Sequence, residues 1–185
     1  MSQTTGPQGA AHPAADAAAG HWVLDPAHSS VRFRSKSIWG LVTVKGGFGA
    51  ISGEGEVGAD GAAHGTVTVQ TTSVDTKNPK RDTHLRSEHF FASEEHPALV
   101  FTATSVTPTA GAADGAVEVS GDLTVRGTSR PLSFPARVTA ASAREVTLEA
   151  EVTVVRADFG MTWNQLGMLG GSTVATVTAR FRHEG

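Results

Sequence analysis

The chain has 185 residues, a length that favours one domain with a core large enough to be stable without covalent cross-links. It contains no cysteine, which excludes disulfides, thiolate metal sites and cysteine nucleophiles. Its formal net charge is -3 at pH 7 and it has no block of basic residues, so we expect neither nucleic-acid binding nor electrostatic docking to an anionic membrane.

The start of the chain differs in composition from the rest. Residues 1–20 are rich in Ala and Gly and contain no Leu, Ile, Val or Phe, which predicts a disordered arm. They lack the charged start and long apolar run of a secretory signal, and no window of the sequence is long enough for a transmembrane helix. We therefore expect a cytoplasmic protein with a single folded domain at residues 21–185.

Most of that domain alternates apolar and polar residues with the period of a half-buried strand. In the clearest case, Val117, Val119, Leu123 and Val125 share one face, opposite charged and hydroxyl side chains. The same alternation recurs at residues 30–36, 66–70, 99–103, 132–134, 146–154 and 174–181. These segments predict antiparallel strands that bury one face.

Glycine and proline mark the irregular positions of the predicted strands. Gly46, Gly47 and Gly49 predict bulges or sharp bends within residues 42–57, and Pro131 and Pro135 predict an edge strand or a bulged one. About eight strands at hairpin spacing predict an all-β fold, an antiparallel eight-stranded up-and-down barrel. Because many inward positions carry Val, Ala or Gly, we expect an interior wide enough for one small ligand.

One segment predicts a short helix inserted into the barrel, around residues 79–91. Asn78 is a favourable N-cap and Pro79 suits the first helical position. Asp82 lies four residues before Arg86, in the order that favours an ion pair on the exposed side. We expect the helix to close one side or end of the barrel, with three apolar residues turned inward: Leu85, Phe90 and Phe91.

Arg81, His84 and Arg86 form the densest cationic group of the chain. One interpretation is an anion site for a phosphate or carboxylate head group at the barrel mouth, assisted by N–H groups of the helix N-terminus. The alternative is a solvated helix face whose arginines pair locally with Asp82 and Glu88. The second interpretation is favoured by the sequence alone, because surface ion pairs of this kind are common.

Two other groups of residues leave alternatives open. The loop from Phe159 to Leu169 is rich in large apolar residues and glycine, so Met161 and Trp163 either plug the barrel end or belong to a mobile gate. A metal site assembled from His28, His84 and Asp82 would indicate a metal-dependent enzyme, although none of the usual histidine spacings occurs.

Six motifs occur in a characteristic order between Trp22 and Arg182. They are Leu-Asp-Pro-Ala-His-Ser at 24–29, Gly-Gly-Phe at 46–48, Arg-Asp-Thr-His-Leu-Arg-Ser at 81–87 followed by Phe-Phe at 90–91, His-Pro-Ala-Leu-Val-Phe at 96–101, Gly-Asp-Leu-Thr-Val-Arg-Gly-Thr at 121–128 and Arg-Ala-Asp-Phe-Gly-Met at 156–161. In this order the sequence resembles the YceI-like family of bacterial polyisoprenoid-binding or lipid-binding barrels. The resemblance implies a lipocalin-like barrel with a long hydrophobic channel, no known catalysis and a tendency to form homodimers.

We therefore expect non-catalytic binding, storage or transport of an amphipathic lipid without a cofactor. The lipid would be a polyisoprenoid, such as a prenyl quinone or prenyl phosphate, or a fatty-acyl chain. The head group would lie near Arg81, His84 and Arg86. The residues expected to line the channel are Phe33, Trp39, Phe48, Leu85, Phe90, Phe91, Phe101, Met161, Trp163 and Met168. The alternatives are the metal-dependent enzyme and a structural or interaction barrel with a filled interior.

Overall fold

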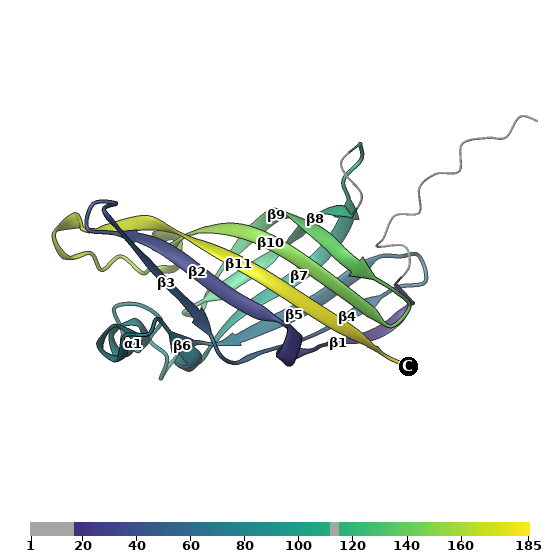
Figure 1. Ribbon diagram of the computed structural model, residues 1–185, viewed down its shortest axis with the longest axis horizontal. Helices are drawn as coiled ribbons and strands as arrows, with labels where there is room; N and C mark the ends of the chain where they lie inside the picture. Colours follow the sequence, from purple (N-terminus) through teal and green to yellow (C-terminus); the bar gives the residue numbers. More distant parts are fainter. Residues whose placement is uncertain (1–16, 112–114) are drawn as a thin grey trace, which may run out of the picture.

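The structure is a computed structural model that describes residues 17–111 and 115–185 (Figure 1). Residues 1–16 of the predicted arm lie outside the described residues, and the first strand begins at Gly20. The strands are β1 (Gly20–Leu24), β2 (Ser30–Ser37), β3 (Val42–Phe48), β4 (Ile51–Val57), β5 (Ala63–Gln70), β6 (Val74–Asp75), β7 (Ala98–Pro108), β8 (Ala116–Val125), β9 (Thr128–Ala141), β10 (Glu145–Val155) and β11 (Leu169–Glu184). The helices are α1 (Pro79–Arg86) and four 3-10 turns, η2 (Pro26–His28), η3 (Thr71–Ser73), η4 (Arg156–Phe159) and η5 (Gln165–Gly167).

These strands form one closed antiparallel barrel. The first three barrel strands are each interrupted, so that β1 continues as β2 after η2, β3 as β4 after Gly49 and Ala50, and β5 as β6 after η3. Each barrel strand pairs with the next one in the sequence, and β11 pairs with both β1 and β2 to close the ring. The predicted eight-stranded up-and-down barrel is confirmed for the described part of the chain.

Inward glycines lie where neighbouring backbones approach most closely. A Cβ atom added to Gly121 would lie 2.1 Å from the carbonyl oxygen of Thr102, and one added to Gly65 would lie 2.6 Å from that of Glu54. Only glycine fits such an approach without a shift of the backbone. The expected break near Gly49 separates β3 from β4.

The wall between β9 and β10 is paired over only part of its length. β9 pairs with β8 from Thr128 to Arg137, but its pairing with β10 runs only from Ala136 to Ala141 within the described residues. Pro131 and Pro135 lie in the stretch without a β10 partner, as expected for residues that lack an N–H donor. The edge character predicted from these prolines is therefore local to one half of an otherwise interior strand.

Helix α1 begins where the sequence predicts and ends earlier. The Asn78 side chain accepts a hydrogen bond from the Arg81 N–H at 3.1 Å, and Pro79 occupies the first turn. The helix ends at Arg86, because the Ser87 hydroxyl and N–H both bond to the His84 carbonyl. The expectation of a helix reaching residue 91 is corrected to eight residues. No helix among the described residues has the length and apolar character needed to span a bilayer.

The buried apolar side chains of the interior form three clusters. One contains Leu24, Ile51, Val69 and Ala179, and a second contains Val117, Val119, Ala136 and Val138. The third contains Val125, Phe159 and Met161. Phe159 and Met161 belong to the segment between β10 and β11, which Figure 1 shows at the same end of the barrel as α1, away from the C-terminus. We call this end the α1 end.

Candidate functional site

The inward side of the barrel wall is apolar but incompletely covered. Several inward-facing side chains are only half-buried, whereas Val117, Val119 and Val138 on the same wall are buried. The half-buried set is Val31, Phe33, Val67, Phe101, Leu123, Phe134, Leu148 and Val177. All of them except Phe33 pack against the buried clusters, and we interpret the surface that they leave accessible on the inward side as apolar space inside the barrel. A filled core would bury them as completely as it buries Val117.

Four of the predicted channel residues form one continuous group. The Phe33 and Phe48 ring centroids are 5.6 Å apart, and those of Phe48 and Phe91 are 5.7 Å apart. Phe91 in turn packs with the cluster that contains Met161. This row runs from the β2–β3 wall to the α1 end. The Phe101 and Phe134 ring centroids are 5.3 Å apart, and Phe101 packs against the cluster around Val117 and Val119.

Phe90 and Trp163 belong to a second group together with two histidines. The His84 ring lies 4.5 Å from Trp163 and 5.1 Å from Phe90, measured between ring centroids, and the His89 ring lies 5.5 Å from Trp163. His84, His89 and Phe90 come from α1 and the turn that follows it, and Trp163 comes from the loop before β11. The aromatic contacts therefore join this loop to the helical segment.

The remaining predicted channel residues lie near the α1 end. Leu85 and Met168 are half-buried. Trp39 is 67% exposed, because it lies at the tip of the β2–β3 hairpin with a positive φ of 52°. The main-chain N–H of Trp39 donates to the Met168 carbonyl at 3.2 Å. The structure thus brings Trp39 to the rim of the barrel, outside the interior group.

Both arginines of the predicted head-group site also fasten α1 to the preceding segment. Arg81 donates through Nε to the Thr76 hydroxyl at 2.8 Å and through Nη2 to the Thr76 carbonyl at 2.9 Å. Arg86 donates to the carbonyls of Thr72 at 3.0 Å and Val74 at 3.2 Å. These bonds hold the helix against β6 and η3.

The ion pair expected between Asp82 and Arg86 is not formed within the described residues. Asp82 is buried, and its carboxylate accepts hydrogen bonds from the Thr76 N–H at 2.9 Å and the Thr76 hydroxyl at 2.5 Å. A carboxylate in the first turn of a helix is also favoured by the helix dipole. The acid therefore turns toward the strand segment, and the expectation of a surface pair is corrected.

Arg156 holds the loop before β11, a role that was not predicted from the sequence. Its guanidinium donates to the carbonyls of Gly170 at 2.8 Å, Met161 at 3.0 Å and Trp163 at 2.8 Å. Burial lowers the pKa of Arg156 from its ordinary value. A charged group that leaves water needs such acceptors, so the loop carbonyls and the arginine stabilise each other. The Arg-Ala-Asp-Phe-Gly-Met motif at 156–161 was the available signal.

The structure does not bring His28, His84 and Asp82 together. His28 Nδ1 lies 2.7 Å from Asp25 Oδ2, an oxygen that Arg182 also contacts at 2.6 Å. His84 lies in the aromatic group, and Asp82 is bound by Thr76. Among the residues that the structure describes, no three His, Asp or Glu side chains are arranged to hold a metal ion.

The fold and interior define a class of protein: a closed antiparallel barrel with an apolar inside and one capped end. The YceI-like domain model matches residues 22–183, and the chain belongs to the YceI-like family. A UPF0312 protein of Staphylococcus aureus (strain N315) is 30% identical over 159 residues, which cover 82% of this chain and 88% of that protein.

Two solved structures share the fold. BcnA of Burkholderia cenocepacia has a TM-score of 0.75 at 18% identity, and the match covers 85% of this chain and 98% of that one. A polyisoprenoid binding domain from Saccharophagus degradans, implicated in plant cell wall breakdown, has a TM-score of 0.70 at 18% identity, with 88% and 98% covered. At such identities the similarity establishes the architecture.

Proposed function

We propose that the protein binds one amphipathic lipid, a polyisoprenoid or a fatty-acyl chain, with the tail inside the barrel. The observation that carries the proposal is the accessible apolar surface on the inward side of a closed wall. Membership of the YceI-like family and the similarity to a polyisoprenoid binding domain support an isoprenoid tail. The role would be storage or transport without catalysis. The homodimer and the cytoplasmic location stay predictions.

The tail would run along Phe33, Phe48, Phe91 and Met161 and reach Phe101. Phe159 and Met161 are 5% and 7% exposed and cover the α1 end, so the segment from η4 to β11 must move for a long tail to enter. Glycines and an adaptable methionine suit such movement. We therefore prefer a gate to a permanent plug for this loop.

The decisive measurement is the affinity for a series of saturated and prenyl alcohols that differ only in tail length. Each methylene removed from water contributes about 0.8 kcal/mol, so affinity should rise about fourfold per methylene until the interior is full. Phe48→Ala should weaken binding, and Thr153→Ala, at an exposed position of β10, serves as the control. Native mass spectrometry of protein from cells should show bound lipid. An absence of any length dependence would refute the carrier function.

The head group would lie near Arg81, His84 and Arg86. Within the described residues, the Nη1 groups of both arginines make no hydrogen bond, so donors are available for an anion. Arg81→Gln and Arg86→Gln should weaken phosphate-headed ligands more than neutral alcohols of equal length. Because both arginines also hold the backbone, urea unfolding must accompany the titrations. Equal losses for both ligand types would assign the arginines to the fold alone.

A further inference from the structure

Large apolar side chains that are exposed gather at one end of the barrel. Among the described residues there are six of them, and we call this set the apolar rim: Ile38, Trp39, Leu41, Val42, Val155 and Leu166. They come from the β2–β3 hairpin, the end of β10 and the loop before β11, all at the α1 end (Figure 1). Leu41 and Leu166 are 83% and 79% exposed. Exposed apolar side chains gathered at one end of a barrel indicate an interaction site.

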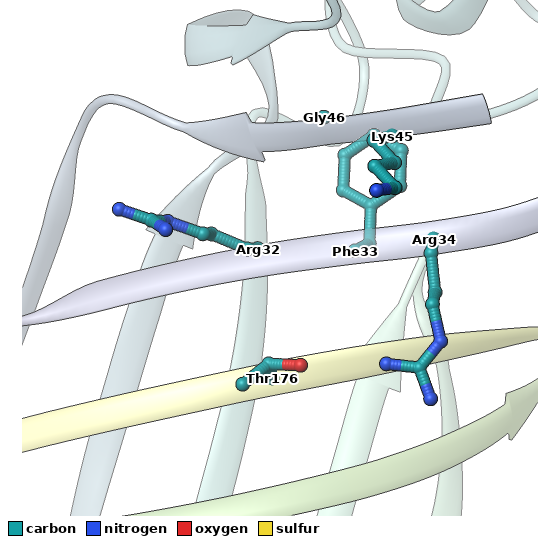
Figure 2. Close-up of a pocket in the computed structure, with 6 residues that line it drawn as sticks. All are labelled: Arg32, Phe33, Arg34, Lys45, Gly46 and Thr176. Carbon is teal, nitrogen blue, oxygen red and sulfur yellow. The ribbon is translucent and has the colours of Figure 1, made fainter.

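A basic surface adjoins the apolar rim on the outside of β2 and β3. Arg32, Arg34, Lys36 and Lys45 are exposed and point outward from these strands. Figure 2 shows Arg32, Arg34 and Lys45 on these two strands, with Thr176 on the neighbouring β11. Together with Phe33 and Gly46 they line a hollow of about 220 Å³. Arg34 pairs with Glu151 at 3.1 Å. The other three cations make no ion pair within the described residues.

The rim segments themselves carry no charge. Residues 37–44 and 159–171 contain no Asp, Glu, Lys or Arg. The net charge of -3 for the whole chain argued against membrane docking, but this total does not describe the α1 end, where an uncharged surface lies next to basic residues. The uncharged apolar rim lies next to the exposed cations of β2 and β3, whereas carboxylates such as Glu149, Glu151 and Asp158 lie on neighbouring elements.

We propose that the apolar rim docks on the surface of a bilayer that contains anionic lipids. Trp39, Leu41 and Leu166 would enter the headgroup region, where Trp is favoured, and the cations of β2 and β3 would contact lipid phosphates. A second copy of the chain is a poorer partner for the apolar rim, because a symmetric pair would bring together the basic surfaces of β2 and β3 from both copies. The charge complementarity selects the anionic bilayer.

Docking at this end would set the covered opening of the barrel against the membrane. A lipid tail could then pass between bilayer and interior without crossing water. This delivery role rests on the proposed function, whereas docking itself rests only on the rim and its cations. The two ideas therefore fail separately in the experiment below.

The test is co-sedimentation of the full chain with vesicles of phosphatidylcholine, alone or mixed with phosphatidylglycerol. Wild-type protein should bind the mixed vesicles, and its tryptophan emission should shift to the blue by more than that of a Trp39→Phe variant, since Trp22 and Trp163 also emit. Leu41→Ser with Leu166→Ser should weaken binding about tenfold or more, because apolar insertion is lost. Lys36→Glu with Lys45→Glu should do the same, and the residual binding should be less sensitive to salt than that of wild type, because the attraction to lipid phosphates that salt screens is lost. Arg144→Glu, exposed at the opposite end, is the matched control and should bind like wild type.

The rim variants should keep wild-type affinity for a soluble short-chain alcohol, which separates docking from tail binding. Loss of alcohol binding with intact vesicle binding would remove the carrier function and leave docking standing. The proposal would be overturned if wild-type protein did not co-sediment with mixed vesicles. It would also be overturned if the rim variants bound these vesicles as well as wild type does. A dimer that dissociates in the Leu41→Ser and Leu166→Ser variant, without vesicle binding, would assign the rim to a second copy.

Discussion

Arg156 shows how one side chain determines the shape of the α1 end. Its three bonds reach main-chain carbonyls 5, 7 and 14 residues further along the chain. Arg156→Lys keeps the charge but loses the planar fork of donors. Hydrogen bonds to charged groups contribute about 1.5–3 kcal/mol each, so we expect a loss of about 1–3 kcal/mol in the free energy of unfolding by urea. Arg126→Lys, which removes a single exposed bond to the Gly160 carbonyl, is the control and should cost less.

An effect of Arg156→Lys no larger than that of Arg126→Lys would contradict this account. Proteolysis gives a second measurement, because the loop before β11 should become accessible only in the Arg156 variant. The comparison separates loop anchoring from a general loss of surface charge.

Asp25 makes stability depend on pH. Burial raises the pKa of its carboxyl, but hydrogen bonds from His28 and the Ala27 N–H and the charge of Arg182 outweigh burial and hold the pKa below its ordinary value of 3.8. An acid whose folded-state pKa is depressed contributes stability above its unfolded pKa, and that stability is lost as the pH falls through the folded pKa. The urea midpoint should therefore fall below about pH 4, and Asp25→Asn should flatten that fall.

Asp75→Asn is the control for this prediction. The hydrogen bond from the Lys77 side chain lowers the pKa of Asp75, but both side chains are largely exposed, so solvent screens the pair. We expect Asp75→Asn to change the pH profile less than Asp25→Asn does. Identical acid profiles for wild type and Asp25→Asn would show that other carboxylates set the acid limit.

At the residue scale, alternation predicts which side chains face inward and does not predict their partners. Phe33 faces inward because both of its strand neighbours, Arg32 and Arg34, are charged. Trp39 lies in an uninterrupted apolar stretch, where composition does not distinguish a channel wall from an exposed hairpin tip. The acceptors of Arg156 were not predictable either, since they depend on a loop conformation that has no periodic signal.

At the scale of elements, glycine positions determine where neighbouring strands approach each other most closely. The Cβ atom that Gly121→Ala adds would lie 2.1 Å from the Thr102 oxygen and 2.9 Å from the Ala103 Cα, so β7 or β8 must shift. Overpacking of this kind costs about 1–3 kcal/mol. Gly171→Ala has no atom within 4 Å of the added Cβ and should change the unfolding free energy by less than about 0.5 kcal/mol. Urea unfolding of both variants measures the difference, and equal effects would refute a steric role for Gly121.

The beginning of α1 was predictable from the sequence and its end was not. Asn78 and Pro79 are strong local signals, and both act as expected. The helix ends at Arg86 because the hydroxyl and the N–H of Ser87 share the His84 carbonyl. The apolar residues Phe90 and Phe91 suggested a longer helix. The break between β3 and β4 at Gly49 was predictable for the same reason, because a glycine is a strong local signal.

At the scale of the whole molecule, closure was predictable because every strand carries an inward apolar row, and an open sheet would leave one face of those rows exposed. The pairing of β1 with β11 then follows, although these strands lie at opposite ends of the described chain. The grouping of exposed apolar residues into one rim was not predictable, because it depends on which loops meet at the α1 end.

The same inward rows offer a test between an open interior and a filled one. Ala150 is half-buried and packs against the cluster around Val117, whereas its strand partner Ala136 is 9% exposed within that cluster. If the space beside Ala150 belongs to the ligand, Ala150→Phe should leave the unfolding free energy within about 0.5 kcal/mol of wild type and weaken binding of long tails about tenfold or more, because the ring displaces several methylenes. Ala136→Phe enters a packed cluster and should cost about 1–3 kcal/mol. A similar loss of stability in both variants would mean that the interior is filled, and the lipid-carrier function would then be replaced by a structural barrel.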